Sequence, residues 1–324
     1  MAKAWKVRFD MQRLLRLGWA GTLLFCGLRG IPAQDLSPRA YIITPISANA
    51  INLTSSFFDG SINFNGVLPA TGATGTYNVG IFSLYHSFNF FGRSANVVGA
   101  LPYAVGNFEG TIAGAGENLY RSGLADTIYR FSVNLKGGPA MQAREFVKWK
   151  QKTLIGVSLK VTAPTGQYDP TKLIGWGTNR WAFKPEVGYS RRGGQWILDA
   201  YAGVWFFTTN PEYWSNNIYY PGTRSLAENP VGALESHLSY DFKKDQLWIS
   251  LDGNYWFGGS TIVNGVENPA TRAKNSRIGA TVSIPVNRHH AVKVSYSDGA
   301  HIEFGGNYQN VSVSWQYGWL GRPK

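Results

Sequence analysis

The sequence predicts an all-β fold, an antiparallel transmembrane β-barrel of about 12 strands with both chain termini on the periplasmic side. Three observations predict this fold. Apolar and polar residues alternate over segments of roughly ten residues, which is the pattern of strands that cross a bilayer. The connections between these segments are alternately short and long. The composition combines many aromatic residues and glycines with few charges.

The composition separates a membrane barrel from a soluble domain. Charged residues make up 15% of the chain, against roughly 25% in a soluble domain. Aromatic residues also make up 15%, and there are 38 glycines, yet the mean hydropathy is only −0.18. A barrel reconciles these values, because its apolar residues occupy every second strand position instead of being concentrated in helices.

The charge of the chain argues against nucleic acid as a partner. The net charge is +12, and residues 1–33 contribute six Lys/Arg and one Asp, so 12 − 5 leaves +7 for the remainder. These positive charges are scattered and form no Lys/Arg cluster of the kind that binds a phosphate backbone.

Three parts are predicted along the chain. Residues 1–33 have a basic start, an apolar stretch of about 12 residues and a cleavage position near Ala33, as in a secretory signal peptide. Residues 34–48 form a short periplasmic segment, long enough to thread part of the lumen, and residues 49–320 form the barrel. The only cysteine, Cys26, lies in the signal peptide, so no disulfide is expected in the mature chain.

The stretch 180–190 shows the strand pattern most clearly. Trp181, Phe183, Val187 and Tyr189 share one face, while the opposite face is small or charged. Comparable segments recur, separated by clusters of Gly, Pro, Asn and Asp. The predicted strands are 49–58, 76–88, 94–106, 122–136, 152–164, 180–190, 195–207, 230–242, 246–258, 275–286, 290–298 and 307–318.

The connections predict which side each end of the barrel faces. Short connections are expected at 89–93, 191–194, 243–245 and 287–289. Long ones are expected at 59–75, 107–121, 165–179, 208–229, 259–274 and 299–306. Outer-membrane barrels have short periplasmic turns and long extracellular loops. The connection 137–151 is long where a short one is expected, and its second half predicts one or two turns of amphipathic helix with Phe146 and Trp149 on one side.

The two faces of each strand predict a lipid surface and a lumen. Aromatic residues such as Tyr189, Trp196 and Trp319 collect at strand ends, where the membrane interfaces would lie. The opposite faces carry charges of both signs. The predicted lumen-lining residues are Asp126, Arg130, Lys160, Arg180, Lys184, Glu186, Asp199, Glu235, His237, Asp252, Arg277 and Lys293.

Two interpretations of these charges stay open. Because the groups are partly desolvated, most of them are expected to pair, and paired charges would simply fill and stiffen the lumen. Alternatively, they line a pore and set its selectivity, in which case the slight excess of Lys/Arg favours anions.

Two long loops are predicted to guard the external mouth. Loop 165–179 contributes Tyr168, Asp169 and Trp176, which are placed to fold into the mouth. Loop 208–229 contributes Tyr213 and Trp214, which are placed to contact an aromatic or apolar solute. Interfacial anchoring, or packing of the loops against each other, explains the same residues.

No residue pattern predicts an enzyme, a cofactor or a metal site. The five histidines lie on different strands and turns, without Cys or Glu at ligand spacing. A barrel lipase needs a Ser–His pair, and His237 and Ser239 share a face but lie two positions apart on one strand. We therefore predict no catalytic residues.

The chain also resembles a known family, the MetA-pathway of phenol degradation family of outer-membrane transporters. The resemblance covers most of residues 40–320 and includes the stretch GTNRWAFKPE at 177–186. It is also carried by residues 45–49, 91–93, 101–103, 123–126, 138–140, 162–169, 237–240, 277–280 and 315–317. The resemblance implies a transporting barrel, and it implies a link to aromatic compounds that the residues themselves do not show.

The sequence thus predicts a bacterial outer-membrane channel for passive or facilitated uptake of small solutes, aromatic or hydrophobic compounds among them. Its expected partners are outer-membrane lipid, the solute and, during biogenesis, the barrel assembly machinery. The alternative is a barrel that transports nothing, either a structural or adhesive surface protein or a barrel hydrolase.

Overall fold

The computed structural model describes residues 36–63, 70–112, 115–217, 220–242 and 247–321. The predicted signal peptide, residues 1–33, lies outside the described residues. Among those described, no helix has the length and apolarity needed to cross a membrane.

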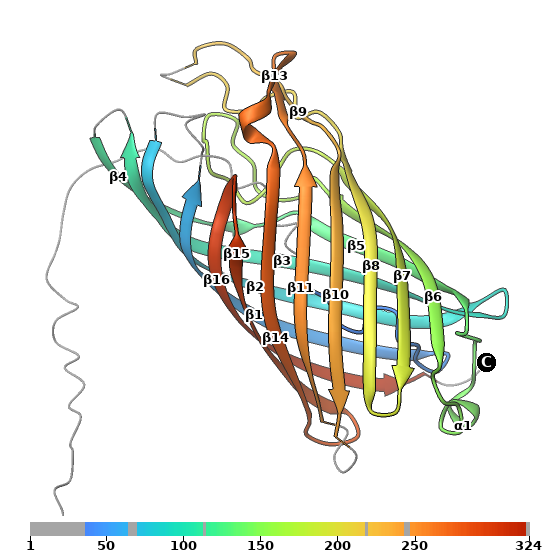
Figure 1. Cartoon of the computed structure of the whole chain (residues 1–324). Helices are drawn as coiled ribbons and strands as arrows, with labels where there is room; N and C mark the ends of the chain where they lie inside the picture. Colours follow the sequence, from blue (N-terminus) through green and yellow to red (C-terminus); the bar gives the residue numbers. More distant parts are fainter. Residues whose placement is uncertain (1–35, 64–69, 113–114, 218–219, 243–246, 322–324) are drawn as a thin grey trace, which may run out of the picture.

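The described residues form an antiparallel barrel of 12 strands, as predicted (Figure 1). Each predicted strand is found, and the one predicted at 122–136 is divided into β4 and β5. The strands of the wall are β1 (Ala48–Asn63), β2 (Ala70–Phe90), β3 (Arg93–Ile112), β4 (Ala115–Leu124), β5 (Thr127–Lys136), β6 (Thr153–Ala163), β7 (Ala182–Gly193), β8 (Trp196–Phe207), β10 (Val231–Asp241), β11 (Trp248–Gly258), β14 (Ala273–Pro285), β15 (His290–His301) and β16 (Gly305–Leu320).

The first and last strands close the barrel. β1 pairs with β16 along its whole length, from Ala48 opposite Leu320 to Asn63 opposite Gly305. The start of β1 and the end of β16 therefore lie side by side, at the end of the barrel that carries the short turns. One of these turns, between β2 and β3, has Phe91 and Gly92 at φ 50° and 80°, which is the left-handed geometry of a tight hairpin turn. That the short-turn end faces the periplasm stays a prediction.

The division between β4 and β5 follows from Pro102 on β3. The lower part of β3 pairs with β5 and the upper part with β4. Pro102 has no N–H to donate to a ladder, and it lies between these two parts. Its carbonyl instead accepts a hydrogen bond from the backbone N–H of Ala125, where the chain bends from β4 into β5.

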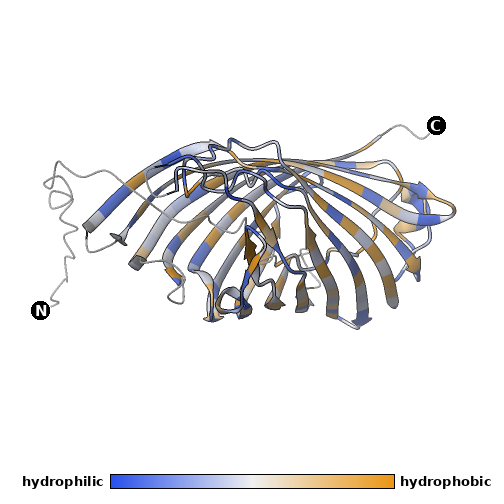
Figure 2. Ribbon diagram, turned by 90° about the horizontal axis from the view of Figure 1, so that it is seen from above, coloured by the Kyte–Doolittle hydropathy of each residue, from blue (hydrophilic) through white to orange (hydrophobic). Residues whose placement is uncertain are grey.

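The alternation along the strands separates an apolar outside from a polar inside. Figure 2 shows hydrophilic and hydrophobic residues following each other along each strand. Leu53, Leu251 and Ile278 are exposed on the outer face, whereas Ser239, Ser250 and Ser190 on inner faces are buried. An outer face of exposed leucine, isoleucine and valine is stable in lipid and not in water. The chain is therefore a protein of the bacterial outer membrane.

Three of the predicted long loops are largely strand, and this is a correction. β1 continues to Asn63 and β2 begins at Ala70, β3 and β4 reach Ile112 and Ala115, and β15 and β16 leave only residues 302–304 between them. The residues concerned are mainly Gly, Thr, Asn and Ser, which weaken the apolar signal but still form ladder hydrogen bonds. The strands therefore extend beyond the membrane-crossing part.

The remaining long connections carry small elements of their own. β9 (Leu226–Glu228), β12 (Thr261–Val263) and β13 (Val266–Asn268) form a separate sheet at the long-loop end, followed by the 3-10 helix η2 (Pro269–Thr271). The helix predicted within 137–151 is α1 (Ala143–Phe146), at the opposite end of the barrel (Figure 1). The rings of Phe146 and Trp149 are stacked, with centroids 6.1 Å apart.

Candidate functional site: the lumen and its mouth

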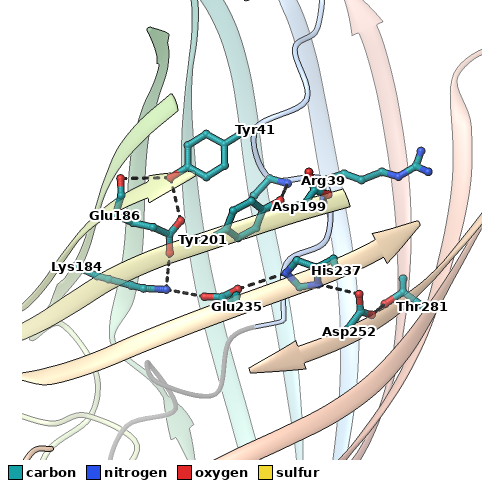
Figure 3. Close-up of polar contacts among 11 residues, drawn as sticks. Arg39, Tyr41, Lys184, Glu186, Asp199, Tyr201, Glu235, His237, Asp252 and Thr281 are labelled. Atoms are coloured by element: carbon teal, nitrogen blue, oxygen red, sulfur yellow. Dashed lines mark hydrogen bonds and ion pairs between the residues drawn. The ribbon is translucent and has the colours of Figure 1, made fainter. Parts of the chain in front are cut away.

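A buried ion network crosses the inner wall from β7 to β14 (Figure 3). Lys184 Nζ lies 2.6 Å from Glu186 Oε2 and 2.7 Å from Glu235 Oε1. All three side chains are at most 8% exposed. A lysine between two carboxylates compensates charges that would be costly to bury alone.

The network continues through His237 on β10. Its Nδ1 lies 2.8 Å from Asp252 Oδ1, and its Nε2 lies 3.7 Å from Glu235 Oε2. Thr281 Oγ1 on β14 donates to the second oxygen of Asp252 at 2.7 Å. The strand register places these side chains in a row across the wall. His237 on β10 is the direct cross-strand partner of both Asp199 on β8 and Asp252 on β11.

The segment before β1 lies inside the barrel. Arg39 binds Asp241 Oδ1 at 2.5 Å through its guanidinium, and its backbone N–H donates to Asp199 Oδ2 at 3.2 Å. The hydroxyl of Tyr41 donates to Glu186 Oε1 at 3.0 Å, which joins this segment to the ion network. Part of residues 34–48 therefore occupies the lumen, as the sequence prediction allowed.

Two paired glycines make the space for the Tyr41 ring. Gly156 on β6 and Gly188 on β7 are cross-strand partners. A Cβ at either position would lie 2.5 Å or 2.1 Å from ring atoms of Tyr41, which no real side chain tolerates. The ring is 1% exposed, and Arg130 lies over it with its guanidinium carbon 4.9 Å from the ring centroid.

Loop 165–179 folds into the mouth at the long-loop end. Trp176 packs against Tyr77 and Phe108 of the inner wall, with ring centroids 5.7 Å and 5.9 Å apart. Trp214 from the second loop belongs to the same buried cluster, and Tyr213 packs against it. The structure thus brings three of the five predicted mouth residues together in one aromatic cluster.

Asp126 holds this loop in place. Its carboxylate accepts hydrogen bonds from the backbone N–H of Gly166 at 2.9 Å, and from the backbone N–H and hydroxyl of Thr178 at 2.9 Å and 2.6 Å. The sequence argument placed Asp126 in a network of ion pairs, whereas the structure uses it as a clamp on the loop backbone.

The other two mouth residues lie on the outer part of the loop. Tyr168 accepts a hydrogen bond from Asn210 at 2.8 Å, and burial raises the pKa of its hydroxyl. Burial alone would raise the pKa of Asp169, but hydrogen bonds from Lys172 and Thr171 outweigh it and lower this pKa below its usual value. These contacts, within loop 165–179 and between it and loop 208–229, fix the conformation of the loop.

The other predicted lumen residues lie on the inner wall or at its upper rim. Arg180 binds Glu228 of β9 at 2.6 Å and lies over Phe207. Arg277 donates to Ser297 at 3.1 Å. Lys160 borders a small cavity of about 50 Å³ next to Lys184 and Glu235.

Lys293 differs from these groups. It lies on β15 opposite Ser314, whose hydroxyl accepts a hydrogen bond from Thr54 across the inner wall. Its side chain is exposed, although it faces into the barrel.

The wall has an apolar depression on its outer side. The ladder of paired residues between β7 and β8 is interrupted at two positions. Lys184 lies opposite Trp205 and Pro185 opposite Val204, and neither pair is formed. A cavity of about 430 Å³ lies there, bordered by Pro185, Val187, Ala202, Gly232 and Phe257 among others. Pro185 removes a ladder donor, and the small residues leave the space unfilled.

The pattern expected of a hydrolase is not formed at His237. Both of its ring nitrogens face carboxylates, and the hydroxyl of Ser239 has no hydrogen-bond partner. In the described part of the chain, no group of three or more His, Cys, Asp or Glu side chains is placed to hold a metal ion.

Comparison with known proteins shows the family. The family described as "Putative MetA-pathway of phenol degradation" matches residues 59–302. The chain belongs to this family. No curated protein matches the chain by sequence.

Solved structures show the same fold. The COG4313 outer membrane channel from Pseudomonas putida F1 superposes with a TM-score of 0.71 at 16% identity, covering 88% of this chain and all (100%) of that one. The β domain of the Bordetella autotransporter BrkA has a TM-score of 0.50 at 14% identity, and 84% of this chain and 100% of that chain are covered.

The sequence argument allowed the segment before β1 to enter the lumen, but it missed the residues that hold the segment there. It singled out none of Arg39, Tyr41 or the glycine pair. One signal was present, since Gly156 and Gly188 interrupt the inward faces of two otherwise well-patterned strands, and an isolated glycine in a strand often marks a close approach of another group.

Proposed function

We propose that this protein is an outer-membrane channel through which small solutes pass by diffusion. One observation carries the proposal. Inside a closed barrel, the side chains of Lys293 and Gln316 remain exposed on the inner wall, so these inward positions of β15 and β16 border a space that water can enter. A barrel whose purpose is structural alone has no need of such a space.

Aromatic and apolar compounds are the solute class that we propose for it. The family to which the chain belongs is described by phenol degradation, and an aromatic cluster around Trp176 and Trp214 packs together at the mouth. The depression around Ala202 lies on the lipid side of the wall, where an apolar solute would collect from the membrane.

Uptake measurements test both parts of this proposal. Gram-negative cells that produce the protein are expected to take up naphthalene faster than cells without it, because a protein route bypasses the slow outer leaflet. Ala202→Phe would fill the depression and is expected to lower this uptake about threefold. Ala200→Phe is the matched control, because it adds the same ring to an exposed position of the same strand outside the depression.

The results distinguish the channel function from the role of the depression in uptake. If neither naphthalene uptake nor ion conductance rises when a correctly folded barrel is produced, the channel proposal is wrong. If both variants at positions 200 and 202 behave like the original protein, the depression has no part in uptake.

A further inference from the structure

The lumen has two walls of different chemistry. From β5 to β14 the inner faces carry the charges, and these are paired or held by neighbouring groups, as in the line from Lys184 to Asp252. Among the described residues of β1, β2, β15 and β16, the inward positions carry hydroxyls, amides and, near the mouth, aromatic rings such as that of Tyr77, but a single charge, that of Lys293.

Lys293 is a cation without an ion-pair partner among the described residues. Lys184 has two carboxylate partners, but no ion pair or hydrogen bond joins Lys293 to any described residue. The charge of Asp252 on the neighbouring wall acts on Lys293, but its carboxylate is hydrogen-bonded to His237 and Thr281 and forms no ion pair with the lysine.

Free hydroxyl groups lie beside this lysine. Ser283 on β14 is its direct cross-strand partner, and Ser295 lies two positions further along β15 on the same face. Neither hydroxyl has a protein hydrogen-bond partner within the described chain, and both side chains are half-buried. An ammonium and two hydroxyl donors on one wall of a wet space suit a passing anion.

We propose that Lys293 is the residue that sets the ion preference of the open half of the lumen, and that it selects small anions, carboxylates included. The proposal rests on the channel function proposed above and names its selecting group. The charges of the opposite wall contribute less, because most of them are buried and several are paired with carboxylates, as Lys184 is with Glu186 and Glu235.

Reversal potentials in planar bilayers test this proposal. In a KCl gradient, the original protein is expected to pass chloride more readily than potassium. Lys293→Gln is expected to lower the chloride-to-potassium permeability ratio about threefold, and Lys293→Glu about tenfold, so that the preference reverses. With potassium benzoate in place of KCl, the same order of variants is expected for benzoate.

A matched control and a folding check keep the test decisive. Lys274→Gln removes the same charge from an exposed, outward position of β14 and is expected to leave the ratio unchanged. Heat-modifiable migration confirms that each variant has folded. If the folded channel conducts and the ratio is the same for all variants, Lys293 does not select ions and the proposal is overturned. If the folded barrel never conducts, the channel function itself is wrong.

Discussion

At the scale of single residues, Lys184 holds the buried charges of the lumen together. It neutralises Glu186 and Glu235 at 2.6 Å and 2.7 Å, and these side chains are almost fully buried. Without it, two carboxylates would share a space from which water is largely excluded, with His237 and Lys160 as the nearby basic groups.

Lys184→Met is therefore expected to destabilise the barrel by about 3–5 kcal/mol, because removing one partner of a buried ion pair leaves the other charge uncompensated. Urea unfolding of the barrel in detergent or lipid vesicles measures this. Lys172→Met is the control, because the Lys172–Asp169 pair is 49% and 40% exposed, and its loss is expected to cost less than about 1 kcal/mol. Equal destabilisation by the two variants would contradict the role given to the network.

At the scale of elements, the segment that enters the lumen depends on one aromatic ring. Tyr41 lies against Gly156 and Gly188 and bonds to Glu186 and Ser158. The segment has no regular secondary structure of its own from residue 42 to residue 45, so its position depends on side-chain contacts of this kind.

Gly188→Ala is expected to displace the segment, because the new Cβ would lie 2.1 Å from the Tyr41 ring. Hydrogen exchange of residues 39–44 would then become faster, and the conductance of the barrel would rise. Gly193→Ala is the control on the same strand, because a Cβ there has no atom within 4 Å. Unchanged exchange in Gly188→Ala would show that the ring does not hold the segment.

The elements also show how far sequence reasoning reaches. The alternation around Val187 and Glu186 was sufficient to assign β7 and its two faces, because successive side chains of a strand point to opposite faces of the sheet. Strand ends were less accurate where Gly and Thr extend β2 and β3, since ladder bonds need no apolar side chain. The contact between Tyr41 and Glu186 was not predictable, because it joins residues 145 positions apart through a segment without a pattern.

At the scale of the whole molecule, the barrel is asymmetric. One wall carries paired charges and the lumen segment, and the other carries hydroxyls, amides and Lys293, with aromatic rings such as that of Tyr77 near the mouth. The aromatic cluster around Trp176 covers the mouth at the long-loop end. A solute that passes through the barrel is expected to follow the hydroxyl-bearing wall, because the opposite wall is filled.

Cysteine labelling tests this central claim most directly. Outside the predicted signal peptide the chain has no cysteine, so Ser314→Cys on the inner wall and Val313→Cys on the outer face each introduce a single thiol. We predict stepwise single-channel currents for both variants, and a charged, membrane-impermeant thiol reagent is expected to reduce only the current of Ser314→Cys. A folded, heat-modifiable barrel without currents, or a Ser314→Cys current that the reagent leaves unchanged, would contradict the account.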